Sequence, residues 1–205
     1  MRKRNILGVS LALLLASAAS SQAVAIIVLN QSFESPGGNN GDYPPATSWV
    51  GSTFTEVSTA IGLSGGHLIR YNGQNGGTTG SQDLGVGFLA DSVYSMTILI
   101  GNRTNDGSNP TGTARFGLTA GGIEQGTFTE VTNAQVAGQT FQDFTYTFTT
   151  GAVAPTGNVG IKLEAAAGGR GLFDNVRLDA TAVPEPSTAL CAVIGGLALL
   201  RRRRR

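Results

Sequence analysis

The stretch that most constrains the fold runs from residue 93 to residue 100, where side chains alternate strictly between two faces. Tyr94, Met96, Ile98 and Ile100 fall on one face, and the residues between them fall on the other. A period of two is typical of a β-strand, because successive side chains of a strand point to opposite sides of the sheet. Both faces carry apolar side chains, so this segment is predicted to be a central strand.

The rest of the chain from residue 26 to residue 183 repeats this pattern in short segments between glycine-rich turns. Phe144, Tyr146 and Phe148 share one face, opposite three threonines, as a half-buried strand requires. The pattern predicts nine or so strands from ten candidate segments, residues 26–34, 49–57, 67–71, 81–88, 93–100, 114–120, 123–131, 144–148, 159–163 and 172–178. The last two form a pair joined across the loop 165–171. Short strands at this spacing favour an all-β domain, an antiparallel jelly-roll β-sandwich.

The composition of this body excludes several classes of protein. The chain has one cysteine, Cys191, which lies near the C-terminus, so the body has neither a disulfide nor a catalytic thiol. Twelve of the thirteen acidic residues but only six of the fourteen basic ones lie between residues 26 and 183, which gives the body a net charge of −6. A nucleic-acid partner is not expected, because phosphate binding needs a clustered basic surface.

The N-terminus is predicted to be a secretory signal peptide covering residues 1–25. Arg2, Lys3 and Arg4 precede an apolar run over residues 6–19, and small residues follow it. This order of basic, apolar and small residues is typical of export signals. Cleavage after Ala23 or after Ala25 fits the pattern equally well, and the domain that remains is expected to span residues 26–182.

The last segment, residues 183–205, has three physically different parts in a row. A rigid turn of Pro184, Glu185 and Pro186 precedes apolar residues 189–200, and the chain ends in a basic cluster of Arg201, Arg202, Arg203, Arg204 and Arg205. Arginines directly after an apolar run stop a segment in the bilayer, because moving them across hydrocarbon is unfavourable. Twelve residues of helix span roughly 18 Å, less than the core of about 30 Å that a stable anchor crosses.

These three parts, in this order, resemble the PEP-CTERM sorting signal of Gram-negative bacteria. The resemblance implies recognition by an exosortase, a membrane-embedded cysteine peptidase, at Pro184, Glu185 and Pro186. It also implies export, transient insertion of the tail in the inner membrane, and a mature form at the cell surface or in the extracellular matrix. An ordinary C-terminal membrane anchor is the alternative.

The body carries a second resemblance, to carbohydrate-binding modules with a galactose-binding-like jelly roll. The motifs are residues 30–34 (NQSFE) at its start and residues 173–178 (FDNVRL) at its end. In such modules a carboxylate after the first strand and an aspartate of the closing strand hold a structural Ca²⁺, which implies Glu34 and Asp174 as ligands here. Two carboxylates and nearby carbonyls suit calcium, which prefers oxygen ligands. The alternative is that both are ordinary edge residues.

Sugar binding needs exposed aromatic rings that stack on a pyranose. Tyr43 and Tyr71, flanked by polar residues and glycine, are the candidates for exposure, and Trp49 is a further candidate for which core packing is favoured. His67 is the only histidine, and no nucleophile elbow, zinc motif or P-loop is present.

The sequence therefore favours a non-enzymatic, exported surface or matrix protein that binds extracellular polysaccharide. The alternatives are a structural matrix protein without a ligand, and a polysaccharide-active hydrolase or lyase.

Overall fold

The structure is a computed structural model of the 205-residue chain. It describes residues 22–35, 46–51, 54–57, 67–72, 78–102, 113–136, 138, 140–165 and 170–183. The segment Ala23–Ala182 forms one compact unit. The apolar run of the signal peptide and the tail from Pro184 onward lie outside the described residues. In the part that is described, no helix is long and apolar enough to cross a bilayer.

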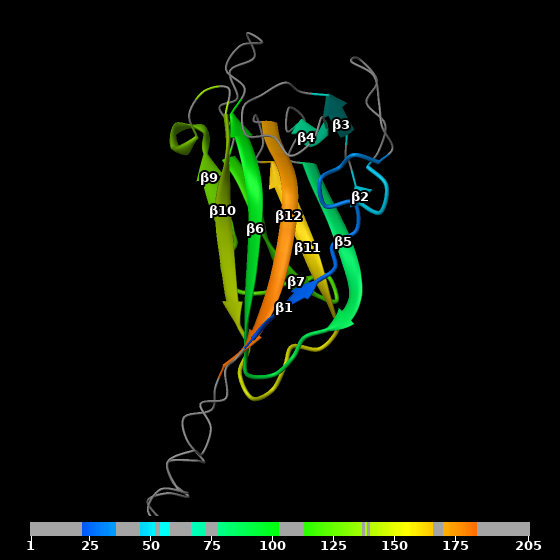
Figure 1. The fold of residues 1–205 in the computed structure, drawn as a ribbon, viewed down its shortest axis with the longest axis vertical. Helices are drawn as coiled ribbons and strands as arrows, with labels where there is room; N and C mark the ends of the chain where they lie inside the picture. Colours follow the sequence, from blue (N-terminus) through cyan, green and yellow to red (C-terminus); the bar gives the residue numbers. More distant parts are fainter. Residues whose placement is uncertain are drawn as a thin grey trace, which may run out of the picture. The chain divides into compact units, whose positions relative to one another are not determined.

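Two antiparallel sheets face each other in this unit (Figure 1). Sheet A has the order β10-β6-β12-β4-β3, with β1 also paired to β12. Its strands are β1 (Ala23–Ile26), β3 (Phe54–Val57), β4 (His67–Asn72), β6 (Ser92–Asn102), β10 (Thr140–Thr149) and β12 (Arg170–Ala182). The all-β sandwich predicted from the alternation is confirmed, and its architecture is consistent with a jelly roll.

Sheet B has the order β2-β5-β11-β7-β8, with β9 also paired to β7. Its strands are β2 (Val50–Gly51), β5 (Thr78–Gly87), β7 (Thr113–Ala120), β8 (Ile123–Glu124), β9 (Thr129–Thr132) and β11 (Asn158–Ala165). A short 3-10 turn, η2 (Asn133–Gln135), follows β9. Every strand pairing described in the two sheets is antiparallel.

The core lies between the two sheets and is built by the predicted alternation. β6 lies between β10 and β12, and its even-numbered residues from Tyr94 to Ile100 are buried, which confirms that it is a central strand. The largest fully buried side chains come from both sheets and from the segment after β1: Tyr94, Phe33, Phe116, Phe173, Met96, Ile98, Leu118, Ile161 and Leu163. Because the domain has no disulfide, burial of this apolar surface is the main source of its stability.

The structure differs from the predicted strands in four respects. The strand expected over residues 26–34 ends at Ile26, because Asn30 and Phe33 adopt positive φ and the chain turns there. The strand expected over 49–57 is split between β2 of sheet B and β3 of sheet A. Gly51 ends β2 with φ 120°, and an added Cβ there would lie 2.2 Å from the Thr79 carbonyl oxygen.

The other two differences concern the C-terminal half. The strand expected over residues 123–131 is broken into β8 and β9 around Gly126, whose φ is 66°. The last two strands do not pair across the loop 165–171, since β11 belongs to sheet B and β12 to sheet A. The alternation predicted most of the strands but carried no information on which sheet each one joins. Three of the four residues of β1 fell within the predicted signal peptide.

An aromatic ring covers the outer face of sheet B next to a network of charges. The ring of Phe128 lies directly over Gly117, and the Arg115 guanidinium stacks 4.5 Å from its centroid. Arg115 also pairs with Glu124, whose other oxygen accepts a bond from Lys162 at 2.9 Å. The bonds from Arg115 and then Lys162 lower the pKa of Glu124 to about 2. The charged side chains on this face therefore pair with one another and have a structural role.

We expect Gly117→Ala to destabilise the domain, because the new Cβ would lie 2.2 Å from the Phe128 ring. Overpacking of this kind typically costs about 1–3 kcal/mol, measurable by urea unfolding. Gly151→Ala is the matched control, since nothing lies within 4 Å of a Cβ there. Equal stability of the two variants would contradict the packing described for Phe128.

Candidate functional site

An apolar pocket of about 430 Å³ opens on the side of the sandwich where β1 and β5 lie. Its walls come from four separate parts of the chain: Val24, Ala25, Ile26, Ile27, Leu84, Val86, Gly87, Leu89, Tyr94 and Ala180. None of these residues carries a charge. The volume lies within the range of about 300–1,000 Å³ that is typical of small-molecule sites.

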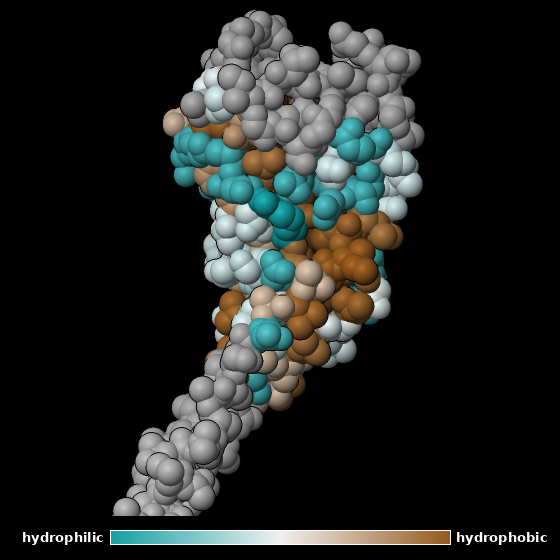
Figure 2. Space-filling view, viewed as in Figure 1, coloured by the Kyte–Doolittle hydropathy of each residue, from teal (hydrophilic) through white to brown (hydrophobic). Residues whose placement is uncertain are grey.

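Exposed apolar side chains surround this pocket. Val24 and Ile27 are 62% and 79% exposed on the β1 side, and Val86 and Leu89 are also exposed on the β5 side. Figure 2 shows the hydrophobic surface gathered over these two strands, whereas hydrophilic residues cover much of the rest of that face. Exposed apolar surface of this kind marks a site of ligand or partner binding.

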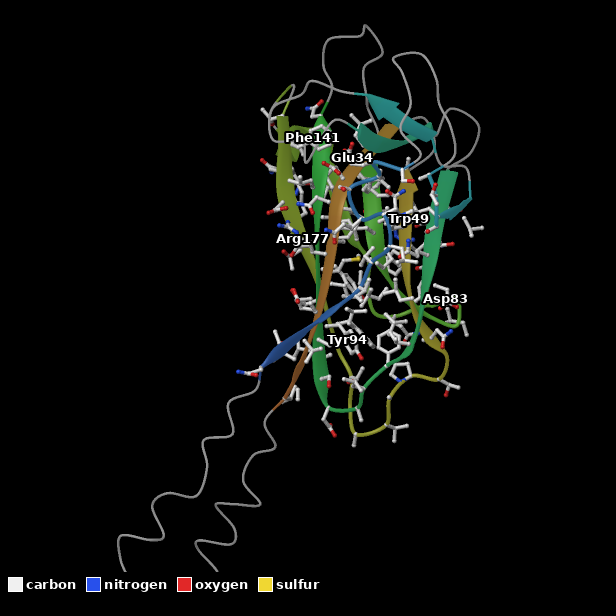
Figure 3. All side chains as sticks on the ribbon, turned by 45° about the vertical axis from the view of Figure 1, so that its right-hand side comes forward. Glu34, Trp49, Asp83, Tyr94, Phe141 and Arg177 are labelled. Carbon is white, nitrogen blue, oxygen red and sulfur yellow. The ribbon has the colours of Figure 1, made fainter. Side chains whose placement is uncertain are left out.

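Tyr94 of β6 forms the floor of the pocket (Figure 3). Its side chain is fully buried, and the Phe88 ring packs edge-on against it with centroids 4.8 Å apart. The Tyr94 hydroxyl oxygen accepts a hydrogen bond from the Leu89 backbone N–H at 2.6 Å. The phenol keeps its own O–H proton to donate, since a hydroxyl is both donor and acceptor.

The β5 side of the rim is fixed by Thr150, which follows β10. The Thr150 hydroxyl donates to the Leu89 carbonyl at 2.7 Å and accepts from the Ser92 N–H at 2.9 Å. The Asp91 N–H donates to the Gly151 carbonyl at 2.9 Å. These bonds hold the connection between β5 and β6 in place, so the Leu89 N–H stays directed at the Tyr94 hydroxyl.

The β1 side of the rim is fixed by Gln82, a buried residue of β5. Its side-chain amide accepts a bond from the Leu29 N–H and donates one to the Leu29 carbonyl, both at 2.9 Å. It also donates to the Ser48 carbonyl at 3.2 Å. One side chain of sheet B thus replaces a strand pairing for the segment that follows β1 of sheet A. We call these contacts the Gln82 clamp.

The segments that carry the two residues expected to bind calcium lie side by side at β12. Asp174 is fully buried in β12, and its carboxylate accepts a bond from the Asn175 N–H at 2.7 Å. A bulge between Asp174 and Arg177 frees the Val176 N–H, which donates to the Gln31 carbonyl at 2.9 Å. The segment that leads to Glu34 therefore runs beside the bulge. Among the described residues, no group of three or more His, Cys, Asp or Glu side chains could hold a metal.

Of the three aromatic candidates for sugar stacking, Trp49 is the one whose side chain the structure describes. Trp49 is buried and its ring lies 5.2 Å from that of Phe33, so it packs in the core as the sequence favoured. Tyr71 lies in β4, and Tyr43 falls outside the described residues, as does the tail with Pro184, Glu185 and Pro186. The sequence search missed the pocket because its walls are unremarkable apolar residues scattered from position 24 to position 180.

Comparison with known proteins assigns the family. Residues 24–179 match the family described as HpiC1-like: HpiC1 cyclase. Because this match covers most of the chain, the protein belongs to the HpiC1-like cyclase family. No curated protein matches the chain.

Several solved structures are similar in fold. The Stig cyclase Fisc from Fischerella sp. TAU, in complex with (3Z)-3-(1-methyl-2-pyrrolidinylidene)-3H-indole, is 20% identical with a TM-score of 0.65 over 78% of this chain and 100% of that one. A cyclase from the same organism in complex with 4-(1H-indol-3-yl)butan-2-one is 21% identical with a TM-score of 0.64, covering 78% of this chain and 98% of that one. The CBM22-1 xylan-binding domain of Paenibacillus barcinonensis Xyn10C is 11% identical with a TM-score of 0.51, covering 81% and 100%.

The family membership overturns the functional expectation drawn from the sequence. The prediction that the chain is a non-enzymatic, polysaccharide-binding matrix protein is wrong, because the family that it matches is one of cyclases. The expectation of no enzyme failed because it rested on missing nucleophiles, zinc ligands and phosphate loops. A ring closure requires none of these groups.

We expect Gln82→Met to destabilise the domain, because it leaves the Leu29 N–H and carbonyl without their partner. These two hydrogen bonds are part-buried. Each such bond typically contributes about 0.5–1.5 kcal/mol, so the free energy of unfolding in urea should fall by about 1–3 kcal/mol. Gln142→Met is the control, since Gln142 is exposed and donates one bond, to the Gln135 carbonyl. A loss no larger than that of the control would show that the Gln82 clamp is not needed.

Proposed function

We propose that the protein is a cyclase that closes a ring in an apolar, ring-containing substrate bound in the pocket between β1 and β5. The pocket itself carries this proposal, since it is apolar, large enough for such a molecule and rigidly bounded on both sides. The family match supports ring closure as the reaction class. The indole ligands of the two Fischerella structures support an aromatic substrate.

The pocket can promote a ring closure in two ways. Its apolar walls exclude water and favour a folded substrate whose reacting atoms lie close together. The Tyr94 O–H supplies a proton donor at the floor, and the bond from the Leu89 N–H stabilises the phenolate left behind. The proton goes to the electrophilic group, the new carbon–carbon bond forms, and the proton lost from the ring carbon returns to the phenolate. The reaction is an isomerisation that consumes no co-reactant.

Binding of 4-(1H-indol-3-yl)butan-2-one, followed by its indole fluorescence, tests the pocket. Gly87→Leu should weaken binding at least tenfold, because Gly87 lines the pocket and its added Cβ meets nothing within 4 Å, so the side chain narrows the pocket without disturbing the core. Gly151→Leu is the matched control, since a Cβ is equally free there and the residue is outside the pocket. Equal affinity in both variants would refute the site.

Tyr94→Phe tests the proton donor separately. It should leave the affinity for an apolar indole within about fivefold, the effect of one hydrogen bond. Turnover of an indole with a tethered alkene should fall by about 10²–10⁴-fold, the usual contribution of a general acid. Unchanged turnover with intact binding would show that the proton comes from another group.

We further propose a structural calcium ion held by Glu34 and Asp174. The donor set fits: both side chains offer hard oxygen ligands, and the bond from the Val176 N–H to the Gln31 carbonyl brings their two segments together. Bound calcium would tie the start of the domain to its closing strand.

Chelator-treated protein should gain several degrees in melting temperature when calcium is added, because a ligand that binds only the folded state stabilises it. Glu34→Gln should lose most of this gain, and terbium luminescence should fall in parallel. Asp179→Asn, a change of another carboxylate on β12, should keep the gain. A melting temperature that does not respond to calcium would remove the ion from the account.

Export through residues 1–25 and sorting through the tail at Pro184, Glu185 and Pro186 stay proposals. They rest on the sequence pattern at the two ends of the chain.

A further inference from the structure

We propose that the leader of this chain is cleaved between Ala23 and Val24, so that the mature protein begins at Val24. The inference rests on the proposed export and is independent of the proposed cyclase reaction. The sequence alone leaves two sites open, because Ser21 and Ala23 offer the same pattern of small residues as Ala23 and Ala25. The fold distinguishes between these two cleavage sites.

The strand pairing of β1 favours the first site. β1 pairs in register with β12, with Ala23 opposite Thr181, Val24 opposite Ala180, Ala25 opposite Asp179 and Ile26 opposite Leu178. Cleavage after Ala25 would remove three of these four pairs and expose that edge of β12. Cleavage after Ala23 keeps three of them. Because a strand is held by its ladder of hydrogen bonds, only the first site leaves β1 in the mature protein.

The charge of the new N-terminus favours the same site. Cleavage creates an α-ammonium group, which is costly to move out of water. At Val24, which is 62% exposed, this charge lies at the surface. At Ile26 it would lie on a residue that packs against the hydrophobic core. The second site therefore puts a charge where the domain buries apolar surface.

The pocket and the family match give the third argument. Val24 and Ala25 both line the pocket, so cleavage after Ala25 would remove part of its wall. The match to the family begins at residue 24 and thus includes both residues. The first site is the one that releases a domain with its pocket complete.

The experiment is to produce the full chain with its own leader in a Gram-negative host and to determine the N-terminal peptide of the mature protein by mass spectrometry. The expected peptide begins at Val24. A peptide that begins at Ile26 or elsewhere, or a retained leader, would overturn the proposal. This readout needs no ligand, so its failure is distinct from a failure of the proposed cyclase function.

Two matched substitutions sharpen the test. Ala23→Leu should abolish or shift cleavage, since it removes the small residue directly before the proposed site, whereas Ala25→Leu should leave the cleavage position unchanged. The opposite result would assign the second site. A third comparison uses two chains released from fusions, one beginning at Val24 and one at Ile26. The chain that begins at Val24 should have a melting temperature several degrees higher. Equal melting temperatures would show that β1 does not contribute to the stability of the domain.

Discussion

The Gln82 clamp is the interaction on which the open side of this sandwich depends. Among the described strands, β1 pairs with β12 alone, and after Ile26 the chain leaves the sheet to cross towards sheet B. The amide of Gln82 meets both backbone groups of Leu29 there and connects the two layers. Without it, the segment that carries Phe33 into the core would lose two part-buried hydrogen bonds to sheet B.

The same geometry explains why a pocket exists at this place. The clamp holds the β1 segment on one side, and Thr150 holds the connection between β5 and β6 on the other. Between them the apolar interior extends to the surface, with Tyr94 at its floor. A rigid frame around an apolar opening suits a substrate that must be folded and kept from water. None of the residues that line the pocket is charged, and the ion pair of Arg115 with Glu124 lies on the outer face of sheet B.

Much of the fold could be predicted from the sequence because strand periodicity is a local signal. A central strand is predicted by the spacing of Tyr94, Met96, Ile98 and Ile100 alone, and all four side chains are buried as expected. The interruptions at Asn30, Gly51 and Gly126 could not be predicted, since they depend on backbone conformations that only the packed sheets require. The membership of β11 and β12 in different sheets is equally non-local.

The site was less predictable than the fold. Its walls are ordinary apolar side chains that only the tertiary structure brings together, and its single polar group, Tyr94, reads as a core residue in an alternating strand. A search for motifs recognises catalysis by nucleophiles and metals, and the residues that line this pocket carry no such motif. The expectation that Glu34 and Asp174 bind calcium came from a family resemblance. The spacing of residues along the sequence does not reveal which distant segments come together.

The central claim is that the pocket between β1 and β5 binds the substrate, and amide hydrogen exchange with and without 4-(1H-indol-3-yl)butan-2-one tests it most directly. The account predicts slower exchange on binding in β1 and in residues 84–89, with little change in the outer strand β10. Protection centred on β10, or no protection at a saturating concentration of the indole, would contradict it.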